Sequence, residues 1–182
     1  MATFDINTFK AKLKNGGARP NQFQVQFTYP AGIATPPDAA AYLVTVAELP
    51  GQTIGVAPVY FRGREIKLAG DKVFAPFTCT ILNDTDFTLR QTLEEWMNLI
   101  ESNTFKTGTT NPLIYQQPIE VTQLNRSGIA LRTYNLRGAF PTDISPIGLD
   151  FAANDQLSSF GVTFQYQDFV VISPSAGQQS IV

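Results

Sequence analysis

The sequence predicts a β-rich α+β protein: an antiparallel β-sandwich or open barrel, flanked by one main α-helix and carrying a long projecting β-hairpin. Three observations predict this fold. Several short segments alternate apolar and polar side chains with the period of two that half-buried strands show. One segment near the middle repeats its apolar residues at helical spacing instead. Between them lies a long stretch with β-rich arms interrupted by glycines, which is typical of an irregular hairpin.

The first predicted element is a short amphipathic helix, because Ile6, Phe9 and Leu13 recur at helical spacing. Gly16 and Gly17 are expected to end it. The same region holds a basic cluster, most simply a solvated helix face, made of Lys10, Lys12, Lys14 and Arg19.

A half-buried strand is predicted over 21–29, where Phe23, Val25, Phe27 and Tyr29 alternate with polar residues. The proline-rich segment 30–42 is predicted to be a surface loop. Residues 42–49 resume as a strand.

The predicted hairpin occupies residues 54–77. Gly63 is expected to mark a bulge and residues 69–71 to form the turn. Residues 77–82 alternate again and form a further strand. Cys79 is the only cysteine of the chain, so it has no intramolecular disulfide partner, and its place in the apolar alternation predicts a small core residue.

The main helix is predicted to follow, with about sixteen residues. Its apolar stripe would be formed by Leu89, Leu93, Trp96, Met97 and Ile100. Its N-cap candidates are Asp84, Thr85 and Asp86. Further strands are predicted in 118–125, 128–141 and 157–171, and residues from about 171 to 182 are predicted to be a flexible tail. No repeat or linker divides the chain, so residues 1–182 are expected to form a single domain.

The chain is poor in charge, with 15% charged residues against a usual share of about 25%. This favours either a surface partly covered by partners or a Phe-rich β protein with a polar, uncharged surface. The net charge of −2 argues against nucleic-acid binding driven by counterion release. The N-terminus has no apolar signal-peptide core and no segment reaches about 18 apolar residues, so we expect neither secretion nor a membrane span.

The sequence gives little support for a catalytic or metal-binding site. The chain has no histidine, which excludes His-based nucleophilic and metal sites. A calcium-loop spacing (Asp84, Asp86, Thr88 and Glu95) fails because Leu89 stands where glycine is needed. Three loosely clustered aspartates are more typical of turn caps than of acid–base catalysis: Asp143, Asp150 and Asp155. We expect no catalytic residue, cofactor or metal, and therefore no enzyme.

Long stretches of the chain resemble the tail tube proteins of contractile-tailed bacteriophages. The resemblance runs in order from Ile6 to Phe169 and is carried by "ARPNQFQVQF", "LPG", "FRGREIKLAGDKVFAPFTCTILNDTDFTLRQTLEEW" and "YNLRGAFPTDISPIGLDF". It implies a β-sandwich or barrel flanked by a helix, assembled into hexameric rings that stack into a hollow tube inside a contractile sheath.

The same resemblance implies the partners and the place of action. These would be identical subunits, the tail sheath protein, baseplate hub and tail terminator proteins, a tape measure protein in the lumen and DNA in transient, non-specific passage. The protein would belong to the virion tail and be assembled in the host cytoplasm. A basic lining would retard DNA, and the pI of about 5.1 permits a weakly negative lumen lined by Gln, Thr, Asn and Asp.

The hairpin resembles the extended loop with which this family bridges subunits, here about 49–72. Its predicted contact residues are Arg62, Arg64, Glu65, Lys67 and Asp71, since charges there can set register between copies. The alternative is a solvated edge hairpin whose charges only discourage aggregation.

Two other functions stay open. One is the inner tube of a phage-like bacteriocin or of a contractile injection or secretion system. The other is a monomeric carbohydrate-binding β-sandwich. The loop at 30–42 and the end of the chain both extend beyond the family pattern, and either could line the lumen, meet the sheath or extend freely outside the tube.

Overall fold

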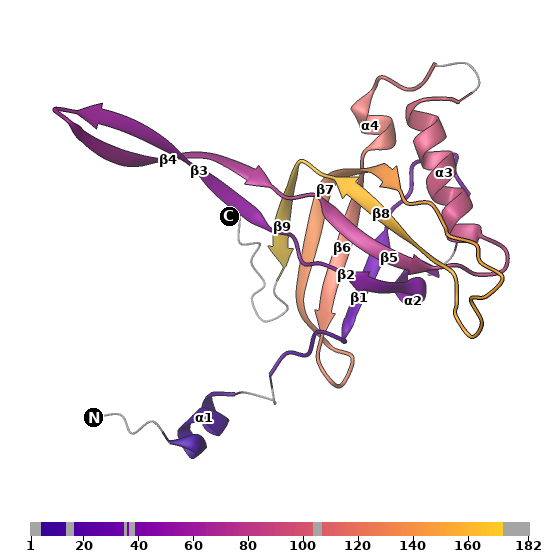
Figure 1. Ribbon diagram of the computed structural model, residues 1–182, viewed down its shortest axis with the longest axis horizontal. Coiled ribbons are helices and arrows are strands. Elements are labelled where there is room, and N and C mark those ends of the chain that lie inside the picture. The colour runs from indigo at the N-terminus through magenta and orange to yellow at the C-terminus, as the bar shows by residue number, and fades with distance from the viewer. Residues whose placement is uncertain (1–4, 14–16, 35, 37–38, 104–106, 173–182) are drawn as a thin grey trace.

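The computed structural model describes residues 5–13, 17–34, 36, 39–103 and 107–172. Two antiparallel sheets enclose the core, helix α3 lies beside them, and a two-stranded hairpin projects away (Figure 1). The helices are α1 Ile6–Lys12, α2 Ala39–Leu43, α3 Thr88–Ile100 and α4 Pro112–Tyr115. The strands are β1 Phe23–Phe27, β2 Val44–Ala47, β3 Gln52–Phe61, β4 Arg64–Phe74, β5 Phe77–Leu82, β6 Gln117–Leu124, β7 Ala130–Ile144, β8 Ser159–Gln165 and β9 Asp168–Ile172.

Strand β7 joins the two sheets. Its first part pairs with β6 on one side and β9 on the other, and β6 in turn pairs with β1. From Phe140 onward β7 pairs with β8, which continues through β5 to β2. The strand changes sheets next to Gly138, whose φ of +63° is a conformation that glycine adopts without strain. The predicted β-rich fold is therefore confirmed, in the form of two sheets that share one strand.

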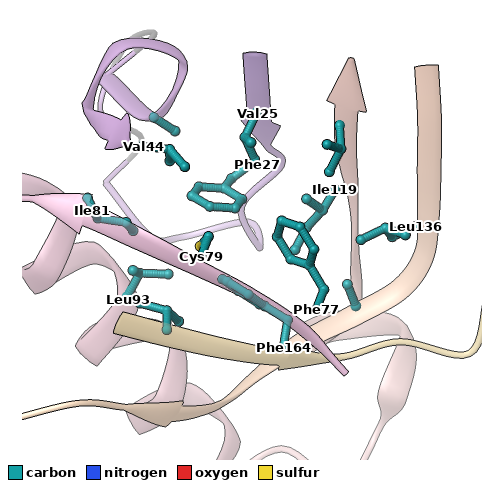
Figure 2. Close-up of a cluster of buried hydrophobic side chains, with 14 of the residues drawn as sticks. Val25, Phe27, Val44, Phe77, Cys79, Ile81, Leu93, Ile119, Leu136 and Phe164 are labelled. Atoms are coloured by element: carbon teal, nitrogen blue, oxygen red, sulfur yellow. The ribbon is translucent and has the colours of Figure 1, made fainter. Parts of the chain in front are cut away.

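The core lies between the sheets, where apolar faces of β1, β5, β6, β7 and β8 meet (Figure 2). The alternation predicted for β1 and β5 is confirmed, with Val25, Phe77, Cys79 and Ile81 buried. Phe164 of β8 lies among these residues, with its ring centroid 5.3 Å from that of Phe27. The strands thus bury one face each, as the period of two requires.

Helix α3 covers one end of this core. Leu89, Leu93 and Trp96 are buried, as the helical stripe predicts, whereas Met97 and Ile100 are half-buried. The helix has 13 residues rather than about sixteen, because Phe87 before it has a left-handed φ of 52°. The N-cap prediction is wrong, because Phe87 holds that position and not Asp84, Thr85 or Asp86. Asp84 still accepts a hydrogen bond of 3.0 Å from the backbone N–H of Thr88.

The predicted hairpin exists, but its turn and its bulge were assigned the wrong way round. The turn is Arg62–Gly63, with φ values of 47° and 79°, as two-residue hairpin loops require. The bulge lies where the turn was predicted: Gly55 of β3 stands opposite Gly70 and Asp71 of β4. Glycine serves both kinds of irregularity, so composition alone did not separate them.

Other element boundaries also differ from the prediction. The loop predicted at 30–42 contains α2, which takes in Tyr42 and leaves β2 to begin at Val44. The strand predicted at 157–171 is two strands, β8 and β9, and the second extends to Ile172. The described residues therefore form nine strands. Lys14, Gly16 and the tail at 173–182 lie outside the described residues.

Candidate assembly surface

The β3–β4 hairpin stands apart from the two main sheets (Figure 1). Every residue of both strands is exposed except Phe74, which is half-buried. The ring of Phe74 packs 5.9 Å from Tyr166 and 5.6 Å from Phe169, measured between centroids. The base of the hairpin is therefore fixed to β9 and to the connection between β8 and β9, while the remainder extends into solvent.

One face of the hairpin is apolar. In the antiparallel register Val59 pairs with Ile66 and Ala57 with Leu68, so these side chains share a face. Val59, Ile66 and Leu68 are 47%, 49% and 53% exposed. Phe61 continues the same face toward the tip and is also exposed. A row of exposed apolar side chains on a two-stranded ribbon indicates a surface that another chain covers.

The hairpin also offers unpaired backbone. In the described part of the chain, β3 and β4 pair only with each other, so each has one edge whose N–H and C=O groups face outward. Such edges add strands from neighbouring chains readily. The exposed apolar side chains and the unpaired backbone of the hairpin thus both favour contact with a neighbouring chain.

Charges at the predicted contact positions are distributed over both faces. Arg62 lies in the turn, with its guanidinium 5.4 Å from the ring centroid of Phe61. Arg64 lies at the end of the apolar face, whereas Glu65 and Lys67 lie on the opposite face. Asp71 lies in the bulge. The structure does not bring these five residues together, and among the described residues no ion pair involves any of them.

Sequence reasoning singled out the charges of the hairpin and missed its apolar face. The signal was present, because Ala57, Val59 and Phe61 alternate, as do Ile66 and Leu68. Without the turn position, the two runs could not be placed opposite one another. The apolar face therefore follows only from the register.

The carboxylates considered for chemistry have structural roles or stand alone. Asp150 accepts a hydrogen bond of 2.9 Å from the N–H of Ala152, as a turn cap does. Glu95 accepts one of 3.0 Å from Gln91 on its own helix. Among the described residues no three Asp, Glu, Cys or His side chains lie close enough to hold a metal ion.

Burial governs the two groups whose pKa shifts most. The core raises the pKa of the Cys79 thiol to about 12, because the thiolate would be desolvated there. Burial, with a smaller contribution from Cys79, also raises the pKa of Tyr29 far above its usual value. Both groups are neutral at pH 7 and belong to the core. No helix of the described residues is long and apolar enough to cross a membrane.

The family model and the similar proteins found by sequence all indicate the same family. The model of the family described as phage tail tube protein matches residues 18–172. The tail tube protein gp19 of Enterobacteria phage T4 is 28% identical over 147 residues, which are 80% of this chain and 86% of that protein. The tail tube protein of Serratia phage KSP90 is 24% identical over 170 residues, 91% of this chain and 95% of that one.

Solved structures share the fold at lower identity. A chain of the anti-feeding prophage baseplate, 6-fold symmetrised, superposes with a TM-score of 0.63 and 18% identity, covering 87% of this chain and 97% of its own. A chain of the extended sheath-tube complex of an extracellular contractile injection system, PVC, superposes with a TM-score of 0.60 and 16% identity, covering 90% and 97%.

Proposed function

The chain belongs to the phage tail tube protein family, and we propose that its copies join through the β3–β4 hairpin into hexameric rings that stack to form the tube. Its role is structural, in the contractile tail of a phage particle. In this arrangement one copy performs no task alone. The function resides in the joined surface of many identical copies.

The observation that carries the proposal is the exposed apolar face of the hairpin. An exposed row of Val59, Ile66 and Leu68 disfavours a solitary chain, because apolar area left in water forgoes roughly 25 cal/mol per Å². A hairpin that inserts against a different surface of a neighbour makes a heterologous contact. Repeated heterologous contacts close into rings or continue as helices, which are the two ways of building a tube.

The polar face of the β1–β6–β7–β9 sheet supports the proposal of a weakly negative lumen. Opposite the buried residues, this sheet presents mostly uncharged polar side chains: Gln24, Gln26, Thr122, Thr133 and Asn135. Glu120 accepts a hydrogen bond from Asn135, and Asp168 is paired with Arg137. Two carboxylates against one guanidinium leave this face slightly negative. DNA would meet little attraction there, because phosphate binding depends on free Lys and Arg.

Further partners follow from the family and from the assemblies in which the same fold occurs. We propose an outer sheath protein, a baseplate hub protein at one end and a terminator protein at the other. A tape measure protein would fill the lumen before DNA passes. Assembly would take place in the host cytoplasm. The likeness to baseplate and sheath-tube chains supports this set through shared fold.

A second function is favoured by the same solved structures, since the fold also occurs in an anti-feeding prophage and in an extracellular contractile injection system. A tube of that kind would carry no genome. Capsid and terminase genes beside the gene for this chain would favour the phage tail. Their absence would favour an injection device.

The decisive experiment is negative-stain microscopy of the purified chain, with sedimentation velocity in parallel. We expect stacked rings with a central hole. The variant Ile66→Asp should remain a folded single chain, because a charge would be buried in the interface. Ile129→Asp is the matched control, since Ile129 is also exposed, at 62%, but lies in the β6–β7 turn. A wild-type sample that stays monomeric at high concentration, with a preformed tail end as template, contradicts the proposal and favours a monomeric carbohydrate-binding sandwich.

A further inference from the structure

Helix α1 presents an apolar stripe that its own domain does not cover. Ile6, Phe9 and Leu13 are 64%, 63% and 43% exposed. At 100° per residue Ile6 and Phe9 lie along one side of the helix, Leu13 follows as its C-cap residue, and Lys10 and Lys12 flank that side. In Figure 1 the helix lies apart from both sheets. It therefore has the side-chain pattern of a docking helix with no docking site on its own body.

The length of α1 makes a partner necessary for its stability. It has 7 residues, whereas isolated helices shorter than about 12–15 residues are marginal in water. None of its residues is buried. Covering the apolar stripe would supply the stabilisation that its backbone lacks.

A groove of matching character lies between α3 and the end of β7. Its volume is about 690 Å³, and Met97, Ile100 and Ile144 supply its apolar surface. Glu101 and Asp143 also line it, and neither carboxylate has an ion-pair or hydrogen-bond partner among the described residues. Along α3 the lining residues run from Arg90 to Glu101, a length of about 16 Å. Helix α1, about 10 Å long, fits within it.

Charges on the helix and the groove are complementary. The apolar stripe of α1 is bordered by two lysines, and the apolar groove is bordered by two unpaired carboxylates. Arg90, the basic residue of the groove, is already paired with Glu94 at 2.8 Å. The same groove would repel an acidic helix and favours a basic one.

The helix and the groove lie at opposite ends of the domain. The segment after α1 enters the sheet at Phe23, which pairs with Gln123 near the end of β6. The groove lies beyond the start of β6, because β7 has already passed Gln117 when it reaches Pro141. The two ends of β6 are roughly 24 Å apart. An arrangement with donor and acceptor at opposite ends suits contact between copies stacked head to tail.

We propose that α1 of one copy docks in the α3–β7 groove of the next copy in the stack. The contact adds a second connection between rings, independent of the hairpin. This contact rests on the proposed function, because only a stack of rings provides a next copy. The stripe packs on Met97 and Ile144, and the lysines pair with Glu101 and Asp143.

Photochemical cross-linking between labelled and unlabelled full-length chains tests the contact directly. Phe9 is replaced by a benzophenone amino acid, which keeps an aromatic side chain, and this chain is mixed with ¹⁵N-labelled wild type. After irradiation, we expect adducts between unlabelled α1 and ¹⁵N-labelled peptides that contain Met97 or Ile144. A chain with the same photoreactive residue at Asn7, on the polar side of α1, is the control and should give at least fivefold fewer of these adducts.

Each outcome of the cross-linking experiment either supports or overturns the proposed contact. Adducts in the labelled groove, in a sample that forms tubes, support the proposal. Adducts confined to the unlabelled chain's own groove overturn it, since the helix then folds back. Tubes without groove adducts overturn the inference and leave the proposed function standing. Groove adducts without tubes overturn both the inference and the proposed function, because no stack then supplies the next copy.

Charge exchange gives a second, independent readout. The double variant Lys10→Glu with Lys12→Glu should raise the concentration needed for assembly roughly tenfold, because two pairs become repulsive. The variant Glu101→Lys with Asp143→Lys should do the same. Combining all four changes should restore assembly to within about twofold of wild type. Equal losses in the combined variant and in either double variant would contradict pairing between these groups.

Discussion

The indole Nε1 of Trp96 donates a hydrogen bond of 2.8 Å to the backbone carbonyl of Tyr115, 19 residues further along the chain. Trp96 has no exposed surface. Its ring also packs against Tyr29 and Phe164, at centroid distances of 6.0 and 6.2 Å. The side chain of Trp96 thus connects α3, α4 and the core, and it holds α3 in position.

Replacing this side chain should impair folding before assembly. Trp96→Ala removes core packing worth about 3–5 kcal/mol and also leaves the Tyr115 carbonyl without its donor. Trp96→Phe should cost less, about 1–3 kcal/mol, since much of the packing is kept. Urea unfolding of the unassembled chain measures both. Tyr42→Ala is the control, because Tyr42 is 82% exposed. Near-normal stability of Trp96→Ala would show that the indole is not a core element.

The period of the apolar residues predicted most of the core but little of the assembly surface. Alternation and helical spacing are local, so they identified the buried faces of β1, β5 and α3 from sequence alone. The apolar face of the hairpin depends on which residues stand opposite each other. The prediction placed the turn at residues 69–71 instead of Arg62–Gly63, and the pairs Val59–Ile66 and Ala57–Leu68 were therefore missed.

Helix α2 and the α3–β7 groove were not predicted from the sequence, for a different reason. Helix α2 lies in a segment whose prolines predict a loop. Ala40 of this helix and Val44, just after its end, are nevertheless buried in the core. Burial of small residues is a tertiary effect that propensity does not report. The α3–β7 groove likewise joins residues about forty positions apart. No local pattern indicates such a site.

Tyr29 carries a buried hydroxyl that has no hydrogen-bond partner among the described residues. Tyr29→Phe should therefore leave stability unchanged or raise it by about 1 kcal/mol, because an unsatisfied polar group is removed from the core. Thermal unfolding of the unassembled chain at pH 7 checks this. Tyr60→Phe, at an exposed tyrosine of the hairpin, should have no effect on unfolding. A loss above 1 kcal/mol in Tyr29→Phe would show that the hydroxyl is satisfied after all.

Stability should fall at alkaline pH through Cys79. Burial raises the pKa of its thiol from an ordinary value of 9.0 to about 12. Above pH 9 the unfolded chain loses this proton while the folded chain keeps it, so the free energy of unfolding decreases as pH rises from about 9 to 12. The expected slope is about 1.4 kcal/mol per pH unit from this group. Denaturant unfolding between pH 8 and 10.5 should show a shallower decline for Cys79→Ala. Identical pH profiles would contradict a buried, protonated thiol.

The charged residues of the hairpin should act on assembly rather than on folding. Reversing both Glu65 and Lys67 should raise the concentration required for tube formation about two- to fivefold at low salt, if they pair with a neighbouring copy. The effect should shrink near 1 M salt, where the Debye length is about 3 Å. Light scattering against protein concentration measures it. Arg126→Glu, in the exposed β6–β7 turn, serves as the control. An effect that does not depend on salt would exclude a charge contact.

The bulge of the hairpin offers a test that separates shape from chemistry. A Cβ added at Gly70 would lie 3.1 Å from the backbone carbon and oxygen of Gly55, so Gly70→Val requires the backbone of the bulge to shift by a few tenths of an ångström. Among the described residues, Phe74 is the one residue of β3 and β4 that packs against the core, so the unfolding free energy should stay within about 0.5 kcal/mol of wild type. Tube formation should nevertheless be lost, because the bulge sets the direction in which the apolar face points.

Gly148→Val is the matched control for this change. Nothing lies within 4 Å of a Cβ at Gly148, which is exposed and outside the hairpin. It should assemble as wild type does. If Gly70→Val also formed tubes at the wild-type concentration, the geometry of the hairpin would be irrelevant to joining the copies. If instead it unfolded, the hairpin would be part of the folding unit, and the separation between a stable body and an assembling arm would be wrong.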